Sequence, residues 1–251
     1  SIALSEPHFG IGGDGIILIS PSDRADAQMR IFNADGSEGK MCGNGIRCVG
    51  KYLYDNGMVG GRTTITIDTL SGVKTLELHV RDGKMQTARV DMGAAILEPA
   101  KIPVNMAGSS VIDAPLVVDE KVYHVTCVSM GNPHCVIFFN EDDVDDLDLS
   151  RLGPKFEHHP LFPERINTEF VNVLPDGSLK MRVWERGSGE TWACGTGACA
   201  TGVAACLNGF CKPDTDITVH LRGGDLTIRY TTETVFMTGA AATVFKGEIE
   251  L

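Results

Sequence analysis

The sequence of 251 residues lacks an excess of positive charge: 22 lysines and arginines stand against 33 aspartates and glutamates, a net charge of −11 at pH 7. A chain this acidic does not attract a phosphate backbone, so we expect no nucleic-acid partner. It also lacks any apolar run of the ~18–20 residues that a membrane-spanning helix needs. Its first twenty residues show no basic start followed by an apolar stretch. We therefore expect no signal peptide, no membrane partner and a cytoplasmic location, or a plastid location in a photosynthetic eukaryote.

None of the eight cysteines belongs to a Cys-x-x-Cys pair. That spacing is typical of structural zinc sites, so we expect no metal. A long chain without a secretory start also favours reduced thiols over disulfides. The acidic run at residues 141–148 lacks the spacing and the glycine of a calcium-binding loop, and it is interpreted as a solvated loop or the start of a helix.

An internal repeat is the first positive feature. Residues 29–72 and 181–224, which are offset by 152 positions, are identical at 13 of 44 ungapped positions. The shared positions include the Met-Arg that opens each segment, a Cys-Gly-x-Gly turn and a later Asn-Gly. One register kept over this length predicts two structurally similar halves.

Each half follows the same order of local signals. An alternating strand (27–32 and 179–184) is followed by a glycine-rich loop, Cys-Gly-x-Gly, and a helix-sized segment (46–55 and 198–207) that ends at Asn-Gly. Two further strands come after each helix, at 63–69 and 73–80 and at 216–221 and 225–230. The second helix carries no charge and is expected to be buried on every face. Many short strands around one helix per half indicate an α+β fold.

The two Cys-Gly-x-Gly turns, at Cys42 and Cys194, are the candidate chemical centres. A cysteine at the start of a helix lies at the positive end of the helix dipole, which lowers the pKa of its thiol. The N–H groups that follow have no intrahelical partner and can hold a carboxylate. If both turns bind one carboxylate, the two thiols lie on opposite faces of its α-carbon. The alternative, small buried hydrophobic residues, suits the other helix cysteines and their neighbour: Cys48, Cys199, Cys206 and Cys211.

Residues 32–38, 41–48, 131–135 and 185–197 resemble the diaminopimelate epimerase family, and the similarity covers nearly the whole chain. The resemblance implies an isomerase that interconverts LL- and meso-diaminopimelate in lysine and peptidoglycan biosynthesis, needs no cofactor and works as a homodimer. It also implies two domains, 1–91 with 240–251 and 92–239, each a barrel-like mixed sheet around a central helix, with the active site in the cleft between them. A strand hairpin usually precedes the loop at residues 10–15 in this family, and we expect it to be missing here.

The resemblance also assigns roles to individual residues. Cys42 and Cys194 are the two acid–base groups, and His134 and Glu185 tune them. The remaining positions bind substrate. Those at the reacting carboxylate are Gly43, Asn44, Gly195 and Thr196, and those at the distant end are Asn33, Asn132, Asn167, Glu185 and Arg186, whose guanidinium fork suits a carboxylate.

Other functions stay open from the sequence. A two-cysteine racemase of the proline racemase type acts on another amino acid, but Asn44 and Glu185-Arg186 favour diaminopimelate. An isomerase of the phenazine-biosynthesis type lacks the cysteine pair that stands here. A non-catalytic binding protein of the same fold is the alternative from a different functional class.

Overall fold

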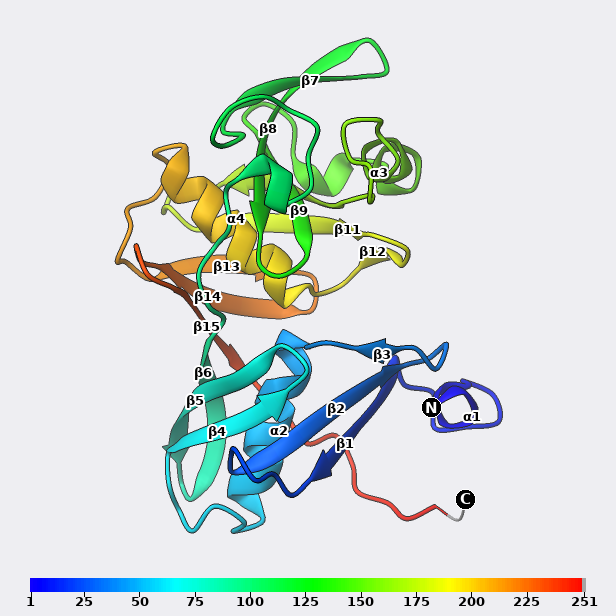
Figure 1. Ribbon diagram of the computed structural model, residues 1–251, viewed down its shortest axis with the longest axis vertical. Helices are drawn as coiled ribbons and strands as arrows, with labels where there is room; N and C mark the ends of the chain where they lie inside the picture. The colour runs from blue at the N-terminus through cyan, green and yellow to red at the C-terminus, as the bar shows by residue number, and fades with distance from the viewer. Residues whose placement is uncertain (250–251) are drawn as a thin grey trace. The chain divides into compact units, whose positions relative to one another are not determined.

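The computed structural model describes residues 1–249, and the chain forms two compact units. The first unit contains Ser1–Asp91 and Thr238–Leu251, and the second contains Met92–Met237. The chain thus leaves the first unit once and returns to it at its C-terminal end, as the colours of Figure 1 show.

The first unit is a sheet wrapped on one helix. Its strands, in the order β1-β2-β4-β5-β6, pair antiparallel except for β2 and β4, which are parallel. Helix α2 packs against β5 and β6 and buries Ile46, Val49 and Leu53. The elements are α1 (Ile2–Ser5), β1 (Gly15–Ser20), β2 (Ala27–Asn33), β3 (Glu38–Gly39), α2 (Gly43–Asp55), β4 (Thr64–Thr69), β5 (Gly72–Arg81) and β6 (Lys84–Asp91).

The second unit repeats this plan with additions. Its sheet order is β14-β13-β11-β10-β9-β8-β7, with parallel pairs at β11/β13 and β9/β10. Helix α4 is buried from Ala198 to Ala205, because small apolar residues occupy all its faces. The elements are η1 (Pro99–Lys101), β7 (Ala114–Val118), β8 (Lys121–Ser129), β9 (Pro133–Phe139), η2 (Val144–Asp146), α3 (Leu149–Glu157), β10 (Asn167–Val173), β11 (Leu179–Glu185), β12 (Gly189–Thr191), α4 (Gly195–Leu207), β13 (Ile217–Leu221), β14 (Gly224–Tyr230) and β15 (Val235–Ala240), the last three residues of which belong to the first unit.

The predicted repeat is confirmed at the level of strand register. The same offset of 152 residues carries the pairs of the first unit onto pairs of the second: Ile31–Gly39 onto Val183–Thr191, Ala27–Ile67 onto Leu179–Val219, and Thr69–Gly72 onto Leu221–Gly224. A slip of one residue would turn every side chain to the other face of the sheet. The two units therefore share one packing pattern, and the predicted α+β fold with two similar halves is confirmed.

Two local predictions were wrong. Both central helices begin three residues earlier than predicted, at Gly43 and Gly195, because the glycines of each turn already have helical geometry. Cys48 was expected to be buried, but it is exposed, and Cys206 and Cys211 are only half-buried. Cys48 lies on the outer face of α2, because the helix turns its other face to the sheet.

A bidentate ion pair follows the repeat. Arg30 Nε lies 2.7 Å from Glu38 Oε1, and Arg182 Nε lies 2.8 Å from Glu190 Oε1. The second pair is the more buried: the Arg182 side chain is 6% exposed and that of Arg30 is 46% exposed.

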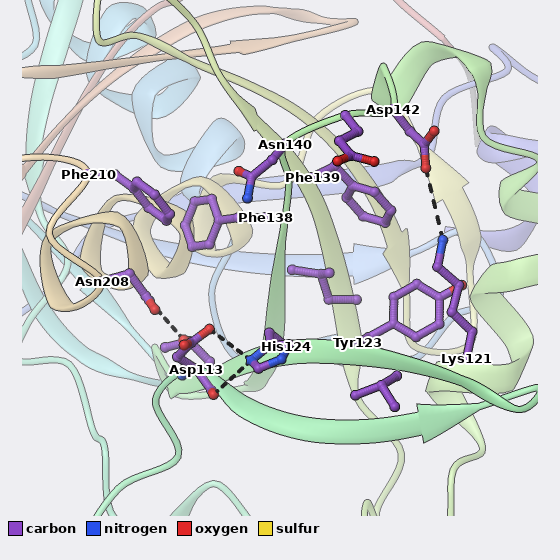
Figure 2. Close-up of a pocket in the computed structure, with 14 residues that line it drawn as sticks. Asp113, Lys121, Tyr123, His124, Phe138, Phe139, Asn140, Asp142, Asn208 and Phe210 are labelled. Carbon is purple, nitrogen blue, oxygen red and sulfur yellow. Dashed lines mark hydrogen bonds and ion pairs between the residues drawn. The ribbon is translucent and has the colours of Figure 1, made fainter.

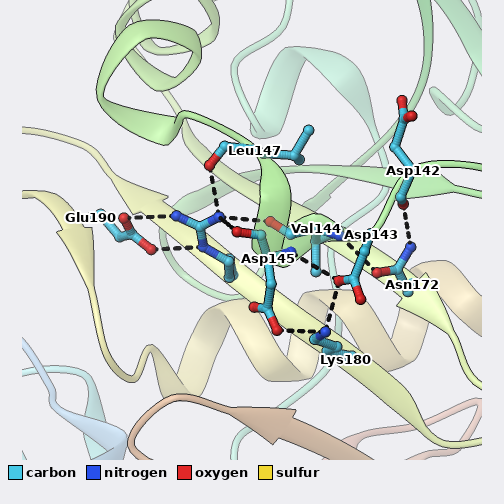
Figure 3. Close-up of polar contacts among 9 residues, drawn as sticks. Asp142, Asp143, Val144, Asp145, Leu147, Asn172, Lys180 and Glu190 are labelled. Atoms are coloured by element: carbon cyan, nitrogen blue, oxygen red, sulfur yellow. Dashed lines mark hydrogen bonds and ion pairs between the residues drawn. The ribbon is translucent and has the colours of Figure 1, made fainter.

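The buried arginine also organises the acidic segment. Its Nη1 donates to the backbone carbonyls of Val144, Asp145 and Leu147, and Figure 3 shows these contacts beside those of Glu190. The carboxylates of Asp143 and Asp145 meet Lys180. Asp148 caps α3, since its side chain accepts from the Arg151 N–H. The acidic run is therefore a turn leading into a helix start, as one of its two interpretations had it.

Candidate active site

Both Cys-Gly-x-Gly turns adopt the same capping geometry. Cys42 and Cys194 are the N-cap residues of α2 and α4, and both have extended backbones. Cys42 Sγ accepts a hydrogen bond from the Gly45 N–H at 3.3 Å, and Cys194 Sγ accepts one from the Gly197 N–H at 3.4 Å. Each sulfur therefore lies at the positive end of its helix.

The second glycine of each turn is required by close packing. A Cβ at Gly45 would lie 2.6 Å from Ile17 Cδ1, and one at Gly197 would lie 2.7 Å from Glu169 Oε1. Neither site has room for a methyl group without displacement of a neighbour. The glycines thus let the helix start approach strand β1 or β10.

The electrostatic surroundings of Cys194 differ from the expectation. Burial raises the pKa of the Cys194 thiol well above its ordinary value, and the carboxylates of Glu185 and Glu169 raise it further. Hydrogen bonds from Thr196 and Gly197 act in the opposite direction and do not compensate. The predicted lowering of the thiol pKa by the helix start is therefore wrong for Cys194, which is 5% exposed, because desolvation of the thiolate outweighs the dipole.

A chain of polar contacts extends from Cys194 into the core of the second unit. Cys194 Sγ lies 3.5 Å from Thr196 Oγ1, which accepts from Asn132 Nδ2 at 3.2 Å. Asn132 Oδ1 lies 3.0 Å from His134 Nε2, and His134 Nδ1 lies 2.7 Å from Glu169 Oε1. The structure thus brings together Asn132, His134, Cys194 and Thr196, as predicted site residues, with a carboxylate that the sequence analysis did not single out.

Glu169 left a weak signal in the sequence. It is the one charged residue of β10, a strand whose other buried members include Phe170 and Val171. A carboxylate inside a buried strand is rarely found without a partner. Its partner His134 lies 35 residues earlier on the parallel strand β9, which no local pattern reveals.

The predicted residues for the distant end of the substrate surround the β11–β12 turn. Asn167 Nδ2 donates to the Pro133 carbonyl at 2.7 Å, and its Oδ1 accepts from the Arg186 N–H at 2.9 Å. Both ends of this amide are therefore occupied by backbone groups. Arg186 Nη1 donates to the Glu164 carbonyl at 3.0 Å, and Glu185 accepts from the Thr191 hydroxyl.

In the first unit, three predicted residues lie near the start of α2. Asn44 Oδ1 accepts from Arg47 Nη2 at 3.0 Å, beside Cys42 and Gly43. Asn33 is exposed at the end of β2, and its Nδ2 donates to Ser37 Oγ at 2.9 Å. The offset of 152 places Asn33 at the position of Glu185, so each unit presents a polar side chain there.

Helix α3 supports the β11–β12 turn through Glu157. Glu157 accepts from Trp184 Nε1 at 2.7 Å, from the Gly187 N–H at 2.9 Å and from Arg165 at 3.2 Å. Burial alone would raise the pKa of this carboxyl, but these donors hold it below its ordinary value. Glu157 thus binds the turn that carries Glu185 and Arg186 as a carboxylate.

Replacement of this carboxylate is expected to make stability less dependent on acid. A folded-state pKa below the unfolded value means stabilisation that is present above the unfolded pKa, about 4.5, and is lost as the pH falls through the folded value. Glu157→Gln is therefore expected to unfold about 1–3 kcal/mol more easily at pH 7. Urea unfolding at about pH 7 and about pH 3.5 measures this difference, which should shrink at the lower pH.

The exposed Glu164 provides the matched control. Glu164→Gln should change the free energy of unfolding by less than about 0.5 kcal/mol at either pH. An undiminished Glu157→Gln deficit in acid would show that the charge of Glu157 is unimportant.

A pocket of about 440 Å³ lies at the other end of α4 and contains none of the predicted site residues. Figure 2 shows Phe138 and Phe210 side by side at one wall, with ring centroids 4.7 Å apart, and His124 beside Asp113 at another. Asn208, which follows the last residue of α4, also lines it. This pocket is separate from the helix start that holds Cys194.

Within residues 1–249, no cluster of three or more histidine, cysteine or acidic side chains is arranged to hold a metal ion. None of the helices described is long and apolar enough to cross a membrane.

Comparisons with known proteins identify the family. Residues 2–98 and 126–244 match the family described as diaminopimelate epimerase. Proteins of that name from Agathobacter rectalis and Acetivibrio thermocellus are each 55% identical to this chain, over 100% and 99% of it and 90% and 88% of their own lengths. One from Methanococcus maripaludis is 50% identical over 99% of this chain and 88% of its own.

Solved structures at low sequence identity share the fold. A probable proline racemase from Agrobacterium radiobacter superposes with a TM-score of 0.72 at 15% identity, over 94% of this chain and 76% of that one. A hydroxyproline epimerase from Agrobacterium vitis gives 0.67 at 17% identity, over 90% and 71%. The family match and the long, highly identical relatives agree with the paired cysteine turns, and this chain belongs to the diaminopimelate epimerase family.

Proposed function

We propose that this protein interconverts LL- and meso-diaminopimelate by moving one α-proton between two thiols, Cys42 and Cys194. The observation that supports this most strongly is the duplicated cap: each cysteine begins a central helix and its sulfur accepts a backbone N–H three residues on. Relatives that are 50–55% identical over nearly the whole chain carry the name of this activity.

The protonation states of the two thiols follow from their burial. Burial and two nearby carboxylates raise the pKa of Cys194, so it carries a proton at neutral pH and acts as the acid. Cys42, which is more accessible, is then the base that removes the α-proton from the opposite face. The reverse reaction exchanges these roles.

The carbanion-like state needs further stabilisation, because an amino-acid α-proton is very weakly acidic. In this proposal the first N–H groups of both helices bind the carboxylate next to the reacting carbon, at Gly43 and Asn44 and at Gly195 and Thr196. Arg186, with Asn33, Asn132 and Glu185, binds the distant end, and Asn167 braces the Arg186 backbone. His134 tunes the Cys194 side through Asn132 and Thr196. No pyridoxal phosphate takes part.

Proton NMR of LL-diaminopimelate in deuterated buffer, with reductant and without added cofactor, tests the proposal. Loss of the α-proton signal together with formation of the meso isomer is the expected result. If the signal persists, a panel of free amino acids, beginning with proline, distinguishes a racemase of another substrate from a binding protein without turnover.

The same proposal includes a homodimer in a reducing compartment, as the family resemblance implies. The eight cysteines are free thiols in the structure. Light scattering coupled to size-exclusion chromatography measures the assembly, and a mass of about 27 kDa, that of one chain, would contradict the dimer.

A further inference from the structure

Glu169 is a buried carboxylate that the two-thiol chemistry does not itself use. Its side chain is fully buried on β10. One oxygen, Oε1, lies 2.7 Å from His134 Nδ1, whereas Oε2 has no hydrogen-bond partner within the described chain. Burial of a carboxylate with one oxygen unpaired is unfavourable, so packing alone gives no reason for an acidic residue here.

The internal repeat shows what packing alone requires. The residue 152 positions before Glu169 is Ile17, which holds the same place in the strand: Ile17 is opposite Ile31, and Glu169 is opposite Val183. Ile17 fills the space against Gly45 as Glu169 fills the space against Gly197. An isoleucine therefore satisfies the fold at this position, and the carboxylate is particular to the second unit.

The hydrogen-bond partners of Glu169 lead to the sulfur of Cys194. Because the Asn132 carbonyl oxygen faces His134 Nε2, that nitrogen donates, and the Glu169–His134 Nδ1 contact contains a second proton. The Asn132 amide then donates to Thr196 Oγ1. With its oxygen accepting this bond, the Thr196 hydroxyl hydrogen is directed to Cys194 Sγ, 3.5 Å away.

We infer that Glu169 is a positioning residue, which orients His134, and through it Asn132 and Thr196, so that the Thr196 hydroxyl donates to the Cys194 sulfur as the thiolate forms. The effect on turnover rests on the proposed function. The effect on the Cys194 thiol is a property of the protein alone. It is measured without substrate.

Two substitutions separate orientation from packing. Glu169→Ile introduces the residue that stands at position 17 and cannot bind His134. Glu169→Gln keeps the shape and a hydrogen bond to Nδ1. The readout is the rate at which iodoacetamide alkylates Cys194 at a fixed pH, followed by peptide mapping, with Cys42 of the same molecule as the internal reference.

In Glu169→Ile, Cys194 is expected to react about tenfold more slowly, because its thiolate loses a hydrogen-bond donor. In Glu169→Gln its rate should stay within about twofold of the parent rate. Cys42 should react equally in all three proteins. An unchanged or faster Cys194 rate in folded Glu169→Ile would overturn the inference, since a faster rate would mean that the negative charge of Glu169 outweighs its orienting effect.

Thr196→Val breaks the chain at its last link and keeps the test decisive if Glu169→Ile does not fold. It should slow Cys194 alkylation to the same extent, and adding Glu169→Gln should change nothing more. An undiminished Cys194 rate in Thr196→Val would also refute the inference. If the parent protein epimerises diaminopimelate, Glu169→Ile should lower kcat about tenfold with little change in KM, and Glu169→Gln should restore it. If it does not, the proposed function fails while the alkylation result still decides the role of Glu169.

Discussion

Cys42→Ala and Cys194→Ala are each expected to reduce epimerisation by roughly 10²–10⁴-fold, because either change removes one of the two groups that exchange the α-proton. The fold should survive, since each cysteine caps its helix through a single weak hydrogen bond to sulfur. Deuterium exchange into LL- and meso-diaminopimelate, followed by NMR, measures the loss. Any residual exchange should be confined to one isomer, and to the opposite isomer in the other variant.

Cys48→Ala and Cys211→Ala are the matched controls. The first changes an exposed thiol on α2, and the second changes a half-buried thiol that follows α4. Neither is expected to alter turnover by more than about twofold, because surface substitutions usually change little. Near-parental turnover in Cys42→Ala or Cys194→Ala would rule out the two-base mechanism.

The second large effect concerns stability. Arg182→Met is expected to lower the free energy of unfolding by about 3–5 kcal/mol, because it removes a buried guanidinium that binds Glu190 and three backbone carbonyls. Arg30→Met removes the repeat-related pair with Glu38, where the arginine side chain is 46% exposed. Its expected loss is only about 0–1 kcal/mol.

Urea unfolding measures both effects. Circular dichroism follows the whole chain, and tryptophan fluorescence follows the second unit, which contains both Trp184 and Trp192. The Arg182→Met transition should move in both signals. Equal losses in the two variants would show that burial does not distinguish the pairs and would contradict the structural explanation.

The sequence alone could predict the features that depend on local pattern. The strands that flank each Cys-Gly-x-Gly turn alternate in polarity, and the helices end at Asn-Gly, so both elements were recognisable. The helix starts were misplaced by three residues, because a glycine turn and the first turn of a helix look the same in a sequence.

The contacts of the candidate site were less accessible. His134 and Asn132 could be named from their resemblance to a family motif, but Glu169 could not, since its partner lies on a strand 35 residues away. The same limit applies to Asn167, whose amide binds two backbone groups from separate segments. Pairings between distant segments depend on strand order, which local periodicity does not encode.

The sequence by itself determined the duplicated architecture and the position of one cysteine at the start of each central helix, because repeats, glycine turns and helix ends are local signals. The tertiary structure decided how each copy of the repeat differs. It buries Arg182 but leaves Arg30 partly exposed, and it places carboxylates close to Cys194, which raises the pKa of that thiol. Burial and charge at a site depend on chain segments that are far apart in sequence, so identical motifs acquire different chemistry only when the chain has folded.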